Sequence, residues 1–299
     1  MEKKTFIATD GKEIRYREWK AENPKGLLQI SHGMAESLAR YEKFAEFMSE
    51  NGFIVVGDDH RGHGETDGCS GYADGDMFRD TLKDVAQLSQ IYKKAYPNLK
   101  LVLFGHSFGS FIAQAYIEEY GAFADGFIVG GSAYMNGFAV ISGRLVAKTG
   151  CFFGKKKKPA KLIAKLSFGA YNKKYKDGTS FISSVKEECD AYNDCKDCGF
   201  ILSYAFYKSM FCAFKRLYRY KSLAQIDVNK PIFLISGAED SVGGCGKLVD
   251  KLYNTYKKIG VKDVGLKLYD GVRHEYLNDV SRDAARADIL DFCRKVAKF

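Results

Sequence analysis

Short apolar runs alternate with amphipathic stretches along most of the chain. The apolar runs are "GLLQIS", "FIVVGD", "KLVLFG", "GFIVGG", "PIFLISG" and "GLKLYD". Between them, apolar residues recur at helical spacing over residues 40–50, 78–96, 110–119, 247–258 and 282–298. Short apolar runs of this kind fit buried strands. Strands that alternate with helices predict an α/β fold with a mostly parallel central sheet flanked by helices.

The first 20 residues have a different pattern. Two alternating runs are joined at Asp10-Gly11, a strong turn signal, so they predict a β-hairpin. This segment carries many charges and no long apolar stretch, and we expect no secretory signal in it. Since no run approaches the roughly 20 apolar residues of a membrane span, we expect a soluble, cytoplasmic protein.

The alternation breaks once, after "GFIVGG", the sixth strand counting the hairpin. Residues 134–222 are rich in Phe, Tyr, Leu and Lys and have the pattern of several amphipathic helices. An insertion at the carboxyl end of a strand lies over the edge where α/β sheets bind ligands. The sequence therefore predicts an α/β core of residues 1–133 and 223–299, with residues 134–222 inserted as a helical cap.

One serine stands between two glycines at a junction of strand and helix. Ser107 lies in "GHSFG", which fits the pattern G-x-S-x-G, with a predicted strand before it and a helix from about Phe108. In a nucleophile elbow the serine occupies a strained turn, and Gly105 and Gly109 remove side chains that would clash there. A serine in an ordinary tight turn is the alternative, and the partners of Ser107 decide between the two.

A nucleophilic serine needs a histidine as base and a carboxylate that orients the histidine. In sheets of this type the order along the chain is Ser, then Asp or Glu, then His. His274 is the only histidine after Ser107, and it follows a predicted strand. "PIFLISGAEDSVGG" places Glu239 and Asp240 after the preceding strand. We predict Asp240 as the carboxylate, with Glu239 as the alternative.

Attack on a carbonyl also needs N–H donors for the oxyanion. One is expected from the residue after the nucleophile, Phe108. The other is expected from "QISHGMAES", where Gly33 relaxes the backbone and the Met34 amide can point into the site. His32 precedes the nucleophile, so we predict that it shapes this loop, and His106, beside Ser107, is also a site-shaping candidate.

Five segments together resemble one family: "SHGMAE", "DDHRGHGET", "GHSFGS", "SGAEDSVG" and "RHEYLND". In this order they are similar to the α/β-hydrolase fold, and to its capped branch of monoacylglycerol lipase-like and lysophospholipase-like serine hydrolases, which includes the serine aminopeptidase type. The resemblance spans nearly the whole chain. It implies Ser107, Asp240 and His274 as a catalytic triad, Met34 and Phe108 as the oxyanion amides, and a bracing role for Asp59, His60 and His63.

Composition narrows the possible partners. The net charge of the chain is +9. Residues 134–221 alone carry +12, with 18 Lys and Arg against 6 Asp and Glu, so the rest of the chain carries −3. A basic cap over the site could contact anionic membrane surfaces, although a solvated basic face is the plainer interpretation. No recognition motif for nucleic acid accompanies the charge. Cys195 and Cys198 have the spacing C-x-x-C but no second ligand pair, so we expect reduced thiols, no metal and no cofactor.

The residues favour a serine hydrolase, and the family resemblance implies that it cleaves carboxylic esters, with monoacylglycerols, lysophospholipids or similar lipids as substrates. Aromatic residues of the cap could line an acyl-chain pocket; the candidates are Phe152, Phe153, Phe168, Phe206, Phe211 and Phe214. The alternative, which we expect for more than half of them, is that they only pack the cap helices onto the core. An aminopeptidase of the same fold is the first alternative, but it needs acidic residues in the cap to hold an amino terminus. A non-catalytic binding protein is the more distant alternative.

Overall fold

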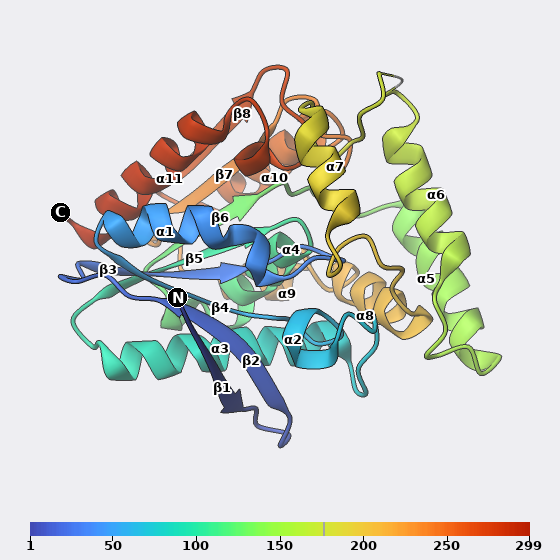
Figure 1. Cartoon of the computed structure of the whole chain (residues 1–299), viewed down its shortest axis with the longest axis horizontal. Coiled ribbons are helices and arrows are strands. Elements are labelled where there is room, and N and C mark those ends of the chain that lie inside the picture. Colours follow the sequence, from blue (N-terminus) through green and yellow to red (C-terminus); the bar gives the residue numbers. More distant parts are fainter. Residues whose placement is uncertain (176) are drawn as a thin grey trace.

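The fold is an α/β sandwich built on one eight-stranded sheet (Figure 1). The structure is a computed structural model that describes residues 1–175 and 177–299. The strands are β1 (Glu2–Ile7), β2 (Glu13–Trp19), β3 (Gly26–Ser31), β4 (Phe53–Asp58), β5 (Lys100–His106), β6 (Gly126–Gly130), β7 (Ile232–Gly237) and β8 (Val264–Tyr269). Their order in the sheet is β1-β2-β4-β3-β5-β6-β7-β8.

All neighbouring strands from β4 to β8 pair in parallel, whereas β1–β2 and β2–β4 are antiparallel. The predicted hairpin forms the antiparallel edge, with Gly11 in its turn at a φ of 86°. The six apolar runs of the sequence are the six parallel strands. Both the fold class and its mostly parallel sheet are therefore confirmed.

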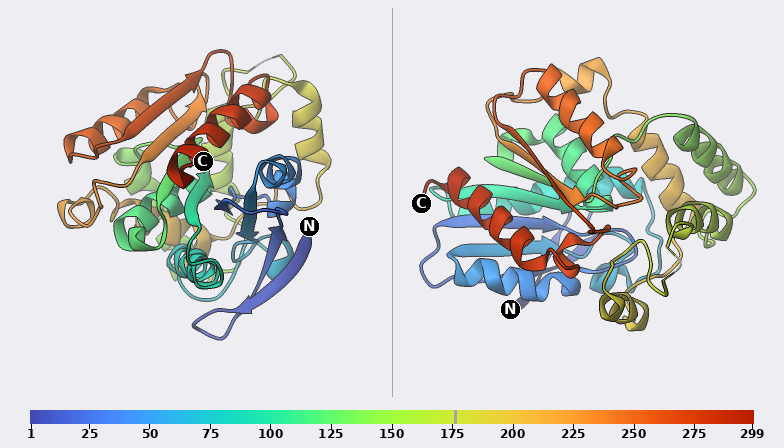
Figure 2. Two further views of the ribbon diagram at one scale, coloured as in Figure 1. Left: turned by 90° about the vertical axis from the view of Figure 1, so that its left-hand side faces the viewer. Right: turned by 90° about the horizontal axis from the view of Figure 1, so that it is seen from above.

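Helices cover both faces of the sheet (Figure 2). The helices outside the cap are α1 (Glu42–Glu50), α2 (Gly64–Asp67), α3 (Met77–Ala95), α4 (Phe108–Glu119), α10 (Lys247–Lys258) and α11 (Arg282–Ala297), with 3₁₀ turns η1 (Leu38–Tyr41), η2 (Gly121–Phe123) and η3 (Tyr276–Asn278). Side chains of α3, α4 and α10 pack into one apolar core, and those of α1 and α11 into a second core. The two cores bury both faces of the sheet, which explains why the inner parallel strands β3–β7 are mostly apolar, whereas the edge strand β8 is only partly buried.

Five helices lie between β6 and β7, where the sequence predicts an inserted cap. They are α5 (Phe138–Phe152), α6 (Lys161–Asn172), α7 (Lys186–Asp194), α8 (Tyr204–Phe214) and α9 (Tyr220–Leu223). In Figure 1, α5, α6 and α7 stand apart from the sheet, at the end opposite the chain's C-terminus. The predicted residue boundaries of core and cap, 133/134 and 222/223, stay a prediction.

Candidate active site

Ser107 occupies a strained turn between β5 and α4. Its φ is +53° and its ψ is −118°, a conformation that costs free energy for a residue with a side chain. The two flanking glycines have no room for a side chain. A Cβ at Gly105 would overlap the carbonyl oxygen of Gly109, and a Cβ at Gly109 would overlap that of Ser31. The turn therefore requires glycine on both sides of the serine, as the sequence pattern predicts.

Three side chains from the carboxyl ends of three strands form one chain of hydrogen bonds. His274 Nε2 lies 2.8 Å from Ser107 Oγ, and His274 Nδ1 lies 2.9 Å from Asp240 Oδ2. The Asp240 side chain is completely buried, whereas Glu239 is exposed. Of the two carboxylates that the sequence left open, the one that contacts His274 is Asp240.

Asp240 is held in place by two further donors. The Val242 N–H donates to Asp240 Oδ1 at 2.8 Å, and the Ser236 hydroxyl donates to Oδ2 at 3.2 Å. Burial by itself lowers the pKa of His274, but the charge and hydrogen bond of Asp240 outweigh it and raise the pKa above its ordinary value. Asp240 thus stabilises an imidazolium at His274.

A segment of the cap holds the loop that carries His274. The His274 N–H donates to the Phe181 carbonyl at 3.1 Å, and the Glu275 N–H donates to the Ile182 carbonyl at 2.8 Å. The Phe181 and His274 rings lie 5.6 Å apart, centre to centre. The position of the imidazole therefore depends on the cap as well as on β8. Nothing in the sequence pattern singled out Phe181 for this contact.

Two backbone amides lie beside Ser107. Within residues 1–175 and 177–299, neither the Met34 N–H nor the Phe108 N–H donates a hydrogen bond to the protein. Met34 and Phe108 line the same cavity as Ser107, and a Cβ at Gly33 would lie 3.2 Å from Ser107 Cβ. Phe108 begins α4, so its amide also has the partial positive charge of a helix N-terminus.

Three buried histidines fix the loop around Met34. His32 Nε2 accepts the His60 N–H at 2.9 Å, so its proton is on Nδ1 and is donated to the Gly33 carbonyl at 2.7 Å. His63 Nε2 accepts the Ala35 N–H at 3.1 Å. Burial lowers the pKa of His63 to about 3 and that of His32 well below its ordinary value, so both are neutral. Among the described residues no group of side chains has the arrangement of a metal site.

The remaining histidine of the elbow, His106, is buried beside the reactive ring. Its ring centre lies 5.0 Å from that of His274. Burial, followed by the charge of His274, lowers the pKa of His106 well below its ordinary value. His106 is therefore a neutral neighbour that packs against His274.

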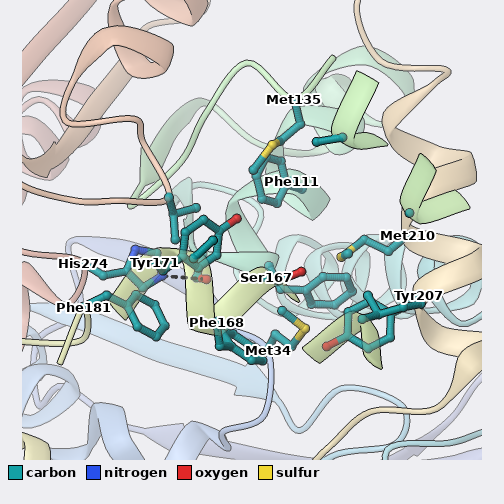
Figure 3. Close-up of a pocket in the computed structure, with 18 of the residues that line it drawn as sticks. Met34, Phe111, Met135, Ser167, Phe168, Tyr171, Phe181, Tyr207, Met210 and His274 are labelled. Carbon is teal, nitrogen blue, oxygen red and sulfur yellow. Dashed lines mark hydrogen bonds between the residues drawn. The ribbon is translucent and has the colours of Figure 1, made fainter. Parts of the chain in front are cut away.

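A cavity of about 390 Å³, here called the first cavity, opens from Ser107 into the cap (Figure 3). Its aromatic lining residues are Phe108, Phe111, Phe168, Tyr171, Phe181, Tyr192, Tyr207, Phe211 and Phe214. In Figure 3, His274 lies at one end of the cavity, and Met210 and Tyr207 lie at the other.

The expected aromatic lining is right in part. Phe168, Phe211 and Phe214 line the first cavity. Phe152 and Phe153 do not: 85% and 69% of their surfaces are exposed. Phe206 is buried outside the cavity, and its ring packs against that of Phe108 at 4.9 Å.

An ion-pair network beside the oxyanion loop was not anticipated from the sequence. Arg40 donates to both carboxylate oxygens of Glu275, at 2.8 and 2.7 Å, and lies 3.7 Å from Glu36. Glu36 accepts the Gly33 N–H and the Tyr41 hydroxyl. The network ties the loop before Met34 to the loop after His274. The sequence offers one signal for this network: Glu36 ends the motif "SHGMAE", and Glu275 directly follows His274.

Comparison with known proteins places the chain among hydrolases. Residues 22–281 match the model of the family described as serine aminopeptidase, S33. The chain is 28% identical over 277 residues to the monoglyceride lipase of Mus musculus, covering 90% of this chain and 82% of that protein. It is 25% identical over 295 residues to the monoacylglycerol lipase of Mycolicibacterium smegmatis, covering 96% and 95%.

Solved structures show the same architecture. A thermostable carboxyl esterase from Bacillus coagulans superposes with a TM-score of 0.90 at 26% identity, over 99% of this chain and 98% of that one. A monoglyceride lipase from Saccharomyces cerevisiae superposes with a TM-score of 0.77 at 19% identity, over 99% and 94%, and supports the fold alone. Because the family model spans residues 22–281, the chain belongs to the serine aminopeptidase S33 family of α/β-hydrolase fold proteins.

Proposed function

We propose that the protein is a serine hydrolase that cleaves carboxylic esters of single-chain lipids, such as monoacylglycerols and lysophospholipids. One observation carries the proposal: the hydrogen-bonded chain from Asp240 through His274 to Ser107 ends in a deep apolar cavity. The relatives named monoglyceride lipase and carboxyl esterase support the same reaction class.

The reaction is a two-step acyl transfer. Ser107 Oγ attacks the ester carbonyl while His274 Nε2 takes its proton, and the charge of Asp240 stabilises the resulting imidazolium. The carbonyl oxygen becomes an oxyanion that accepts hydrogen bonds from the Met34 and Phe108 N–H groups. His274 then protonates the leaving alcohol, and water hydrolyses the acyl-enzyme by the same steps in reverse order.

The lining of the first cavity favours a lipid acyl chain. Apolar side chains predominate along its length, and burial of each CH₂ group contributes roughly 0.8 kcal/mol. Its carboxylates, among the described residues, are Glu36 and Glu275, and both face Arg40. No acidic side chain of the described part of the cap lines it, so nothing there can hold a peptide's amino terminus. Ester cleavage is therefore favoured over the aminopeptidase alternative.

Labelling and turnover test this function directly. A fluorophosphonate probe should label the protein, and Ser107→Ala should abolish labelling; a binding protein without the reaction would not label. Release of fatty acid from monolauroylglycerol and from a lauroyl lysophospholipid should disappear in Ser107→Ala and persist in Ser110→Ala. If the protein hydrolyses a small activated ester but neither of the two lipids, the lipid assignment is wrong.

We also propose that the cap contacts anionic membrane surfaces. Apolar side chains of α5 and α6 are exposed, with Phe138 at 84% and Phe152 at 85%. The lysine-rich segment 155–165 lies between and within these helices. Lysines near an anionic surface contribute about 1 kcal/mol each, and the apolar side chains add partial insertion. Among the described residues no helix is both long and apolar enough to cross a membrane. The cytoplasmic location stays a prediction from the sequence.

Flotation with vesicles tests this contact. The protein should float with anionic phosphatidylglycerol vesicles more than with neutral phosphatidylcholine vesicles, and salt should reduce the difference. The double variant Phe138→Ser, Phe152→Ser should lose flotation. Ile7→Ser, which changes an equally apolar exposed residue on β1, is the matched control. Equal binding to both vesicle types at low salt would refute a role for the basic residues.

A further inference from the structure

A second cavity of about 340 Å³ lies beside the reacting groups. Side chains of η1, α1, the start of α11 and the cap helix α7 line it. Glu36, His106 and Glu275 line both this second cavity and the first cavity. His106, whose ring centre lies 5.0 Å from that of His274, therefore stands between the second cavity and the reacting groups. Its volume is sufficient for a small polar ligand.

One guanidinium group that lines the second cavity, that of Arg286, forms no ion pair with the described residues. Arg40 is neutralised by Glu275, and Arg282 lies 3.2 Å from Glu188 of α7. Arg286, one turn after Arg282 on α11, has no carboxylate within ion-pair distance among the described residues. Its Nε atom is buried and has no hydrogen-bond partner within residues 1–175 and 177–299.

The Arg286 side chain is only partly buried, but the enclosure of its Nε–H has a free-energy cost. Burial, followed by the positive charge of Arg282, lowers the pKa of Arg286 below its ordinary value, and the carboxylates of Asp283 and Glu188 offset this only in part. A buried N–H donor without an acceptor loses its hydration without compensation. An anion in the second cavity would remove both penalties. A guanidinium group can donate two parallel hydrogen bonds to two oxygens of one phosphate, and Arg282, next to Arg286 on α11, is a second possible donor.

We propose that the second cavity binds a phosphate monoester, with Arg286 as its main ligand and Arg282 beside it. The phosphate is the head group of a lipid ester whose acyl chain occupies the first cavity. This inference rests on the proposed function, since it assigns the two halves of an ester to two cavities that share Glu36, His106 and Glu275 in their linings. It ranks anionic lysophospholipids above neutral monoacylglycerols. Inorganic phosphate has the same binding chemistry, so the test must separate the two sources.

Binding to the inactive Ser107→Ala protein tests the site without turnover. Calorimetric titration should show that lauroyl lysophosphatidic acid binds at least about tenfold more tightly than monolauroylglycerol, the effect of one charge-assisted hydrogen bond. Adding Arg286→Gln should bring the ratio of the two affinities close to one. Arg286→Lys, which keeps the charge but loses the fork, should give an intermediate ratio. Arg294→Gln, on the same helix but outside the second cavity, should leave the ratio at its starting value.

Each outcome separates one part of the proposal from another. Equal affinity for the two lipids, or a ratio that does not depend on Arg286, would overturn the head-group assignment. If inorganic phosphate binds in an Arg286-dependent way while the two lipids bind equally, the anion site holds and the lipid source is wrong. Failure of the proposed function would show differently, as absence of ester hydrolysis by the unmodified protein.

Discussion

Replacing Asp240 by asparagine should reverse the proton arrangement on His274. The Val242 N–H needs an acceptor, so the single amide oxygen of asparagine takes the place of Oδ1. The NH₂ group then takes the place of Oδ2 and donates to His274 Nδ1, 2.9 Å away. The imidazole must carry its proton on Nε2, facing Ser107 Oγ, and it can no longer accept the serine's proton.

The loss of charge sets the size of the effect. A carboxylate and an imidazolium whose charges lie about 4 Å apart attract each other by about 4 kcal/mol at an effective dielectric constant of ~20. Removing this attraction from the transition state lowers the rate about 10³-fold, and the wrong tautomer lowers it further. Asp240 does not line the first cavity, so KM should change by less than about threefold.

Steady-state hydrolysis of a chromogenic short-chain ester measures both constants. Glu239→Gln is the matched control, because it removes the same charge from the neighbouring exposed residue and should keep kcat within about twofold. Circular dichroism establishes that both variants fold. The expected loss of kcat is about 10³-fold or more. If Asp240→Asn loses less than about tenfold in kcat, which corresponds to about 1.4 kcal/mol, the argument from the hydrogen-bond network is wrong.

Further predictions concern pH, packing and chain length. Since the base must be neutral and Asp240 raises the pKa of His274, kcat/KM should fall as pH drops through an apparent pKa above 6.5, and Asp240→Asn should shift this limb to lower pH in a pH–rate profile. Gly109→Ala places a methyl group against a strand carbonyl, and thermal melting should show a large loss of stability. Gly169→Ala, in helix α6 with open space around it, should melt at or slightly above the parent temperature. Glu275→Gln leaves the largely buried Arg40 short of its main counterion; urea unfolding should show a loss of roughly 3 kcal/mol, and no loss would mean that the pair is not formed. Met210→Trp narrows the end of the first cavity away from His274, so hydrolysis of long-chain esters should fall relative to short-chain esters, and an unchanged ratio would contradict this placement of the chain.

Local patterns in the sequence were sufficient for the framework and for most of the candidate site. Apolar runs and helical periodicity predicted the parallel strands and the main helices to within a few residues. Glycines on both sides of Ser107 predicted its turn. The exclusion of a side chain at Gly105 is local, since it comes from the Gly109 carbonyl, whereas that at Gly109 comes from the Ser31 carbonyl on β3. The order rule directed attention to His274 and to the pair that contains Asp240.

Only the tertiary structure decided which side chains point into the site and which distant residues they contact. Glu239 and Asp240 are adjacent, and only the path of the loop after β7 turns one of them inward to His274 and the other to solvent. Phe152 and Phe168 have the same chemistry, yet the packing of α5 and α6 exposes one and places the other in the first cavity.

Long-range contacts explain the rest. Arg40 and Glu275 are 235 residues apart in sequence and form one ion pair, and Phe181 of the cap reaches the backbone of His274. A lone arginine in a helical pattern gives no sign of whether a counterion will face it, so Arg286 could be recognised only after folding. A sequence shows local conformational preferences directly, but burial and ion pairing are properties of the packed chain, because they depend on which distant groups exclude water from a given side chain.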